Sequence, residues 1–183
     1  MKILCIGDSN TYGYDPRSYI GSRYSEDVRW TGRLSKWDVV NCGLNGMTIP
    51  RNHARQTGLI RLNDPDLVIV MLGTNDLFSS LSAAEIADRM EGFLKSICAA
   101  GKPVLLISPP HLQYGEWVMD DDLAEESQYL GEEYRIIAER MNCLFADAGE
   151  WDIEMTYDGV HFSPEGHAVF AQRLEEVLVK AGF

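Results

Sequence analysis

Five short apolar runs, separated by stretches with helical spacing, constrain the fold of this chain more than any other feature. The runs occupy residues 2–6, 38–42, 66–72, 103–107 and 143–147. Short runs of this kind are typical of parallel strands that are buried on both faces. Their alternation with helices predicts an α/β fold with a doubly wound parallel sheet and right-handed crossovers. Five strands predict a flavodoxin-like, three-layer α/β/α architecture with the strand order 2-1-3-4-5.

The helices between the runs carry clear start signals. Ser82 and Glu85 form the pattern of a capping box, and Ser163 followed by Pro164 is typical of a helix N-terminus. We expect a helix after each signal. Three further helices are expected over about 28–37, within 51–63 and over about 121–141.

Length and charge limit the domain organisation and the partners. The 183 residues suit one domain, residues 1–183. The formal net charge of −12 repels nucleic acid and anionic lipid headgroups. No run reaches the roughly 18 apolar residues of a membrane span, and no signal peptide precedes the first strand. We therefore expect no nucleic-acid or membrane partner and a cytoplasmic location, while a homo-oligomer stays open.

The cysteines also fit a cytoplasmic location. None of the four shows the C-x-x-C spacing of a metal or redox motif, and three lie in or beside predicted strands. We expect buried, reduced thiols at Cys5, Cys42, Cys98 and Cys143 rather than disulfide bonds or a metal site.

A polar turn, Gly7-Asp8-Ser9, follows the first strand directly. Ligands of open α/β sheets bind at the carboxyl ends of the strands, so Ser9 is either a nucleophile or a helix cap. The glycine spacing fits neither the dinucleotide fingerprint nor the phosphate loop nor the G-x-S-x-G elbow. Taken alone, this turn is more typical of a cap.

Two more polar turns follow the second and third predicted strands. In NCGLNGMT, Gly43 and Gly46 allow a close backbone approach or a positive φ, and backbone N–H groups in such a turn can stabilise an oxyanion. In LGTND, Asn75 offers an amide donor, and Thr74 and Asp76 are suited to hold that loop by local hydrogen bonds. Each turn alone is equally consistent with an ordinary glycine-rich turn or a helix cap.

The fourth polar segment, DGVHFSPEGH, precedes the last predicted helix. Asp158 and His161 lie three positions apart on a turn, where the carboxylate can accept a hydrogen bond from Nδ1 of the imidazole and leave Nε2 as a base. The alternative is an exposed histidine near a helix N-terminus. Taken together, the four segments supply a nucleophile, a base, an orienting carboxylate and donors for an oxyanion, which are the parts needed for acyl transfer.

These four blocks, in this order, resemble those of the SGNH hydrolases, the GDSL esterase/lipase family, over nearly the whole chain. DVRWTGRL (27–34) and DLVIVMLGTND (66–76) are similar to the intracellular arylesterase and acyltransferase branch. The resemblance implies a five-stranded fold in which Ser9 is the nucleophile, His161 the general base and Asp158 its orienter. It further implies an oxyanion hole built from the N–H groups of Ser9 and Gly46 and the amide of Asn75. No metal or cofactor is expected, since no histidine–carboxylate cluster has metal-ligand spacing.

Two long connections, 10–27 and 108–120, are expected to determine substrate choice. Candidate substrate contacts there are Asn10, Tyr12, Tyr14 and Trp117. Tyr19, Tyr24 and Tyr114 are suited either to a sugar, acyl or aryl pocket or to the core. We expect a small-molecule ester with a short acyl group, acetyl to about butyryl, and acyl transfer to alcohols, because a domain of this size has little room for a long acyl tunnel.

Other functions fit the same residues. A carbohydrate O-deacetylase and a lysophospholipase or thioesterase are alternatives within the family. A catalytically silent binding module on the same scaffold is the alternative from another class. The complete set of polar residues argues against the silent module, which has no need of them.

Overall fold

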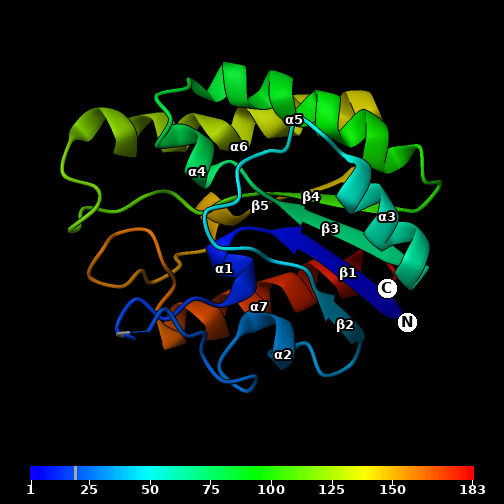
Figure 1. Ribbon diagram of the computed structural model, residues 1–183, viewed down its shortest axis with the longest axis horizontal. Helices are drawn as coiled ribbons and strands as arrows, with labels where there is room; N and C mark the ends of the chain where they lie inside the picture. The colour runs from blue at the N-terminus through cyan, green and yellow to red at the C-terminus, as the bar shows by residue number, and fades with distance from the viewer. Residues whose placement is uncertain (19) are drawn as a thin grey trace.

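The computed structural model describes residues 1–18 and 20–183, and a five-stranded parallel sheet forms its centre. The strand order is β2-β1-β3-β4-β5, so the predicted fold class is confirmed (Figure 1). The strands are β1 Lys2–Gly7, β2 Asp38–Asn41, β3 Leu67–Met71, β4 Val104–Ser108 and β5 Leu144–Asp147. Every position of β3 and β4 is buried, whereas the edge strands β2 and β5 are mostly half-buried, because each has a neighbour on one side only.

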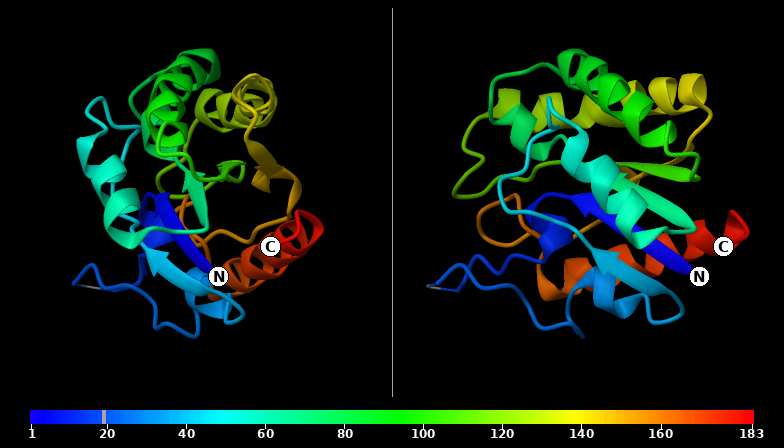
Figure 2. Two further views of the ribbon diagram at one scale, coloured as in Figure 1. Left: turned by 90° about the vertical axis from the view of Figure 1, so that its right-hand side faces the viewer. Right: turned by 45° about the vertical axis from the view of Figure 1, so that its right-hand side comes forward.

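Helices cover both faces of the sheet (Figures 1 and 2). One face carries α3 Ala54–Asn63, α5 Ala83–Cys98 and α6 Asp121–Met141, and the other carries α2 Trp30–Arg33 and α7 Pro164–Lys180. Two one-turn helices, α1 Ser9–Tyr12 and α4 Thr74–Leu77, follow β1 and β3, and a 3₁₀ turn, Ala148–Glu150, follows β5. Across the described residues, none of the helices has both the length and the apolar character of a membrane span.

The helix boundaries follow the sequence signals where caps exist. The capping box of α5 is formed, with the Glu85 carboxylate accepting from the Ser82 N–H at 2.9 Å. Ser163 Oγ caps α7 by accepting from the N–H of Gly166 at 2.9 Å. The helix expected over 28–37 is only one turn long. Leu34 leaves the helical conformation and is buried, and the chain turns back towards β2.

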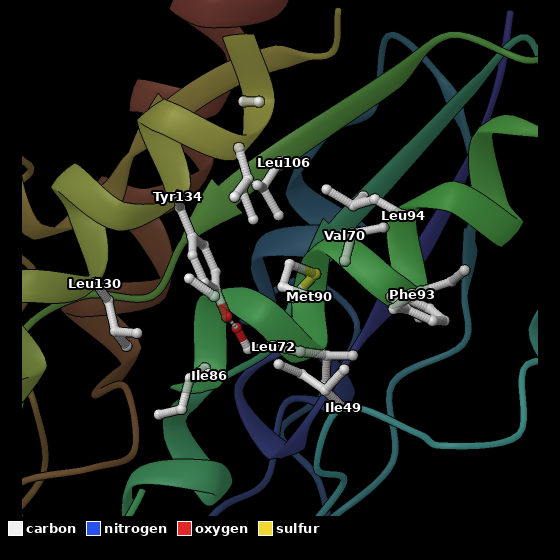
Figure 3. Packing of buried hydrophobic residues seen from close by; sticks show 14 of the residues in the cluster. Ile49, Val70, Leu72, Ile86, Met90, Phe93, Leu94, Leu106, Leu130 and Tyr134 are labelled. Carbon is white, nitrogen blue, oxygen red and sulfur yellow. Dashed lines mark hydrogen bonds between the residues drawn. The ribbon is translucent and has the colours of Figure 1, made fainter. Parts of the chain in front are cut away.

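Two apolar clusters fill the space between the sheet and its helices. Figure 3 shows the cluster under α5 and α6, where Val70 and Leu106 of the sheet lie close to Met90 and Leu94 of α5. The Tyr134 hydroxyl donates to the carbonyl of Leu72 at 2.9 Å, so this buried aromatic residue leaves no polar atom unpaired. On the other face, the second cluster includes Trp30, Phe162, Phe170 and Leu174. Burial of each such large side chain stabilises the fold by about 1.5–3 kcal/mol.

All four cysteines are free thiols. Cys5, inside β1, is buried as expected. Cys42, Cys98 and Cys143 are only half-buried, because they lie at or just beyond the ends of β2, α5 and β5, where the helical layer does not cover them fully.

Several connections gather at one end of the molecule. Segments 13–18, 20–27, 108–120 and 151–162 lie at the same end as α1, and the two chain termini lie at the other end (Figure 1). This is the carboxyl edge of the sheet, because β1 runs from the N-terminus to α1. The candidate site lies at this edge.

Candidate active site

The turn after β1 places the N-terminus of the short helix α1 at this edge of the sheet. Asp8 caps α1, with Oδ1 accepting from the Asn10 N–H at 3.0 Å. Ser9 is the first residue of the helix, and its side chain is 6% exposed. The capping function suggested by the sequence therefore belongs to Asp8, which leaves the Ser9 hydroxyl available for another partner.

That partner is His161, which lies 152 residues further along the chain. His161 Nε2 is 3.0 Å from Ser9 Oγ, and His161 Nδ1 is 2.7 Å from Asp158 Oδ2. An ionised carboxylate only accepts hydrogen bonds, so Nδ1 carries the hydrogen and Nε2 accepts from the serine hydroxyl. All three side chains are buried. This chain of contacts can move a proton from the hydroxyl to the imidazole.

The environment of Asp158 keeps its carboxylate ionised. Burial alone raises its pKa, but the hydrogen bonds from the His161 ring and from the backbone outweigh that effect, and the pKa lies below its ordinary value. Oδ1 accepts from the N–H groups of Val160 and His161 and from Thr156 Oγ1, each at 2.9 Å. The turn thus holds the carboxylate in one orientation against the imidazole.

Three donor groups lie on the loops that follow β1, β2 and β3, which are adjacent strands. Within the described residues, the N–H groups of Ser9 and Gly46 have no hydrogen-bond partner. Gly46 has a φ of +69°, which favours glycine. One amide hydrogen of Asn75 is bonded to the Met47 carbonyl at 3.1 Å, and the second remains available. These groups are donors suited to a developing negative charge.

The predicted close backbone approach occurs at Gly43, where a Cβ atom would collide with the backbone nitrogen of Tyr12. Asn41 holds the same contact, since its Nδ2 donates to the Thr11 carbonyl at 2.7 Å and its Oδ1 accepts from the Gly43 N–H at 3.0 Å. Sequence reasoning missed Asn41. The available signal was a polar residue at the end of an otherwise apolar strand.

Asp76 links two of the donor loops. Its buried carboxylate accepts from the Ile49 N–H at 2.9 Å and lies 3.5 Å from Arg89 Nη1. We expected Asp76 to hold its own loop by local bonds. Instead it holds the neighbouring loop, which carries Gly46, because the parallel sheet brings the ends of β2 and β3 to the same edge.

Asn10, a predicted substrate contact, is buried and has both polar atoms of its side chain bonded within the protein. It is 4% exposed, its Nδ2 donates to the Val160 carbonyl at 2.9 Å and its Oδ1 accepts from the Phe162 N–H at 3.0 Å. Trp30 Nε1 also donates to the Asn10 carbonyl, at 2.9 Å. The side chain therefore holds the backbone around His161.

Two of the predicted aromatic residues contact His161. Ring centroids lie 4.7 Å apart for Tyr14 and 5.2 Å apart for Trp117, the latter edge-to-face. The backbone N–H of Trp117 donates to the Asp158 carbonyl at 3.1 Å, which joins the 108–120 connection to the turn that carries Asp158 and His161. Trp117 is about half exposed, so it faces both His161 and solvent.

The other predicted aromatic residues that the structure describes have surroundings different from those of Tyr14 and Trp117. The ring of Tyr12 stacks under the Arg23 guanidinium at 4.6 Å. Tyr24 is buried edge-to-face on His167, so it belongs to the core, and Tyr114 is exposed. Tyr19 lies outside the described residues.

A groove of about 640 Å³ begins at Trp117 and runs between α4 and the start of α6. Its lining combines apolar side chains with hydroxyl and carboxylate groups, and includes Leu77, Phe78, Ser82, Trp117, Asp120 and Glu126. No lysine or arginine is among its lining residues. The groove thus suits a neutral group with an apolar face and several hydrogen-bond donors.

Two further titratable groups near the site are shifted. Burial raises the pKa of Asp8 to about 6, against the opposing effects of its backbone bond to Asn10 and the charge of His161. Burial, together with the charges of Arg33 and His161, lowers the pKa of His167 to about 3. His167 Nδ1 accepts a hydrogen bond from the backbone N–H of Trp30 at 3.4 Å, which requires that Nδ1 carries no hydrogen. This histidine is therefore a neutral part of the core.

Comparisons with known proteins agree with this geometry. The family description "GDSL-like Lipase/Acylhydrolase family" matches residues 5–169. An acetylxylan esterase from Geobacillus stearothermophilus is 26% identical over 153 residues, which cover 73% of this chain and 68% of the esterase. Among solved structures, Est24, a carbohydrate acetylesterase from Sinorhizobium meliloti, superposes with a TM-score of 0.84 at 29% identity, over 100% of this chain and 99% of Est24. The M. smegmatis aryl esterase superposes with a TM-score of 0.80 at 27% identity, over 97% and 99% of the two chains.

The match covers all four polar blocks from Gly7 to His161, and the fold agrees over the full sheet. The chain therefore belongs to the GDSL-like lipase/acylhydrolase family of SGNH hydrolases and is a carboxylic ester hydrolase.

Proposed function

We propose that the protein cleaves small carboxylic esters through an acyl-enzyme on Ser9. Ser9 Oγ attacks the ester carbonyl carbon while His161 Nε2 takes the hydroxyl proton, and His161 then passes this proton to the departing alcohol. Water then attacks the acyl carbonyl while His161 Nε2 takes its proton, the bond to Ser9 Oγ breaks, and His161 returns the proton to Ser9 Oγ as the carboxylic acid leaves. The observation that carries the proposal is the 3.0 Å contact between Ser9 Oγ and His161 Nε2.

The remaining groups of the site stabilise the charges that develop during this reaction, on the imidazole and on the carbonyl oxygen. Asp158 orients the imidazole and stabilises the imidazolium, because its carboxylate is ionised and 2.7 Å away. The N–H groups of Ser9 and Gly46 and the free amide hydrogen of Asn75 stabilise the tetrahedral oxyanion. Such donors usually supply the largest single contribution to the rate.

For the substrate, we propose short acyl groups, acetyl to about butyryl, on small aryl or alkyl alcohols. Tyr14 and Trp117 pack against the base, and we expect these bulky rings to narrow the approach to Ser9. Bulky rings at the reaction centre also limit the access of water, which favours transfer of the acyl group to an added alcohol. The similarity to the M. smegmatis aryl esterase supports aryl alcohols.

A carbohydrate O-deacetylase is the second candidate, and the groove beside Trp117 favours it. An exposed indole can stack on a sugar ring, while Asp120 and Glu126 can accept hydrogen bonds from its hydroxyl groups. The names of the two carbohydrate-active relatives support the same class. In either case we propose a cytoplasmic location, supported by the four free thiols, which cell fractionation tests.

Three measurements test these proposals. A fluorophosphonate probe should label wild-type protein and leave Ser9→Ala unlabelled; equal labelling of both would contradict the role of Ser9. A rate series of p-nitrophenyl esters from C2 to C12, with products analysed in added alcohol, should peak at or below C4. A maximum at C8 or beyond would contradict the short-acyl proposal. A kcat/KM for acetylated xylooligosaccharides above that for p-nitrophenyl acetate would favour the deacetylase.

A further inference from the structure

Two half-buried thiols lie in contact far from the candidate active site. Cys98 is the last residue of α5, and Cys143 directly precedes β5. Their Sγ atoms are 3.5 Å apart, and both residues are free cysteines. Because the strands are parallel, the start of β5 lies at the amino edge of the sheet, opposite to the edge that carries Ser9.

We infer that Cys98 and Cys143 form a dithiol site that hydroperoxides convert into an intramolecular disulfide bond. A disulfide requires the sulfur atoms at about 2.05 Å, so the two thiols have to approach by roughly 1.5 Å. Cys98 is the last residue of α5 and Cys143 lies between α6 and β5, so neither is held inside an element, and we expect side chains and backbone to make that movement. The inference is independent of the ester chemistry.

The pKa values of the two thiols shift in opposite directions, so the two sulfur atoms have different roles in the reaction. The side-chain hydrogen bond between the two thiols lowers the pKa of Cys98 to about 7, against the effect of burial. The same hydrogen bond, together with burial, raises the pKa of Cys143. The contact therefore favours the thiolate, which is the nucleophilic form, at Cys98 rather than at Cys143.

The chemistry balances with hydrogen peroxide as the oxidant. The Cys98 thiolate attacks one peroxide oxygen, the O–O bond breaks, and the departing hydroxide takes a proton, which leaves a sulfenic acid on Cys98 and one water. The sulfur of Cys143 then attacks the Cys98 sulfur and expels hydroxide, which takes the Cys143 proton and leaves as a second water. Two thiols and one peroxide become one disulfide and two waters.

The bond would join the end of α5 to the start of β5. The closed loop contains β4, the 108–120 connection and α6. Closing a loop of this length restricts the unfolded chain, so we expect the oxidised protein to melt roughly 4–15 °C higher than the reduced protein and to lose that gain with dithiothreitol.

The other two cysteines provide a matched control. Cys5 and Cys42 are neighbours on β1 and at the end of β2, where the Cys42 N–H donates to the Cys5 carbonyl at 2.8 Å. Burial raises the pKa of both thiols, so neither carries appreciable thiolate at neutral pH. Cys5 and Cys42 meet the same oxidant in the same protein, but neither has the thiol hydrogen bond that lowers the pKa of Cys98.

The test is thiol counting and peptide mapping of the full-length protein after stoichiometric hydrogen peroxide. The number of titratable thiols in denaturant should fall from four to two, and a peptide pair linked through Cys98 and Cys143 should appear about 2 Da lighter than its reduced parts. Cys42→Ser should still form this link. Retention of all four thiols, or a link that involves Cys5 or Cys42, would overturn the inference.

Two further measurements separate a wrong inference from a misfolded variant. In Cys143→Ser the serine hydroxyl can still donate a hydrogen bond to the Cys98 sulfur, so dimedone should trap a sulfenic acid on Cys98 at a rate roughly tenfold or more above that of Cys42. Equal rates would contradict the activated thiolate. Phenylarsine oxide, which bridges two adjacent thiols and releases water, should bind wild-type protein in a one-to-one ratio and protect only Cys98 and Cys143 from alkylation. Failure to bridge them would show that the two sulfurs are not in reach of each other.

Discussion

Asn10 holds the backbone on both sides of His161. Its amide donates to the Val160 carbonyl at 2.9 Å and accepts from the Phe162 N–H at 3.0 Å, while its own backbone directly follows Ser9. One residue thus connects the loop of the serine to the turn of the histidine. Because the Ser9–His161 contact depends on the relative position of these two segments, the side chain of Asn10 acts on it without touching a substrate.

Replacing Asn10 should therefore reduce turnover more than binding. Asn10→Leu keeps the volume but leaves a buried carbonyl and a buried N–H unpaired, so kcat should fall roughly 10–100-fold with KM nearly unchanged. Asn10→Asp keeps the acceptor for Phe162 and should lose less. Thr11→Val is the matched control, since Thr11 is the adjacent buried residue and its hydroxyl has no partner among the residues that the structure describes. A KM increase with normal kcat would indicate a substrate contact instead.

Ser9→Ala should abolish ester hydrolysis and leave the fold intact, because only the hydroxyl is needed for chemistry. Ester turnover and the melting temperature are the measurements. Ser108→Ala is the control: within residues 1–18 and 20–183, the hydroxyl of this buried serine at the end of β4 has no partner, and its loss should leave activity near the wild-type level. Residual activity of Ser9→Ala close to wild type would exclude a serine nucleophile at this position.

A panel of histidine variants should single out His161. His161→Ala should remove nearly all activity, whereas His53→Ala and His111→Ala should remove much less. His167→Leu should lower the melting temperature more than the turnover of folded protein, because His167 is buried, neutral and packed between aromatic rings. An indispensable His53 or His167 in folded protein would contradict the assignment of the base.

Asn75→Ala should lower kcat by roughly 10²–10³, the usual cost of one oxyanion donor, with little change in KM. The reason is that the amide acts mainly once charge develops on the carbonyl oxygen. Asn45→Ala, at an exposed position on the neighbouring loop, is the control and should behave like the wild type. A large rise in KM at constant kcat would make Asn75 a ground-state binding residue.

Asp8→Asn should change the pH dependence of stability. The folded state raises the pKa of Asp8 to about 6, so the folded protein keeps this proton while the unfolded chain loses it near its ordinary value. The wild type therefore loses stability as the pH rises from about 4 to above 6, where the buried charge is fully present. Asparagine can still cap α1 but cannot ionise. The variant should match the wild type near pH 4 and melt roughly 5–10 °C higher at pH 7–8. A difference that does not depend on pH would show that Asp8 does not titrate in this range.

Much of the fold could be predicted from local patterns. The β1, β3 and β4 runs are apolar throughout because these strands are covered on both faces, and α5 and α7 begin where their capping residues predict. The helix expected over 28–37 was too long, because the apolar spacing does not reveal that Leu34 leaves the helix to enter the core. The burial of Cys42, Cys98 and Cys143 was overestimated, since residue type says little about coverage at the end of an element.

The sequence by itself determined the strand order, the four polar blocks and the family, because strand burial, caps and short motifs depend on residues close together in the chain. Only the tertiary structure decided that Asn10 turns towards the backbone around His161, that Asp76 bonds to Ile49, that Tyr14 and Trp117 contact His161 while Tyr24 joins the core, and that Cys98 meets Cys143. Each of these contacts joins segments that are far apart in the chain. They form only because parallel crossovers bring the loop ends to one edge of the sheet and the strand starts to the other, and no local pattern records which side chains then meet.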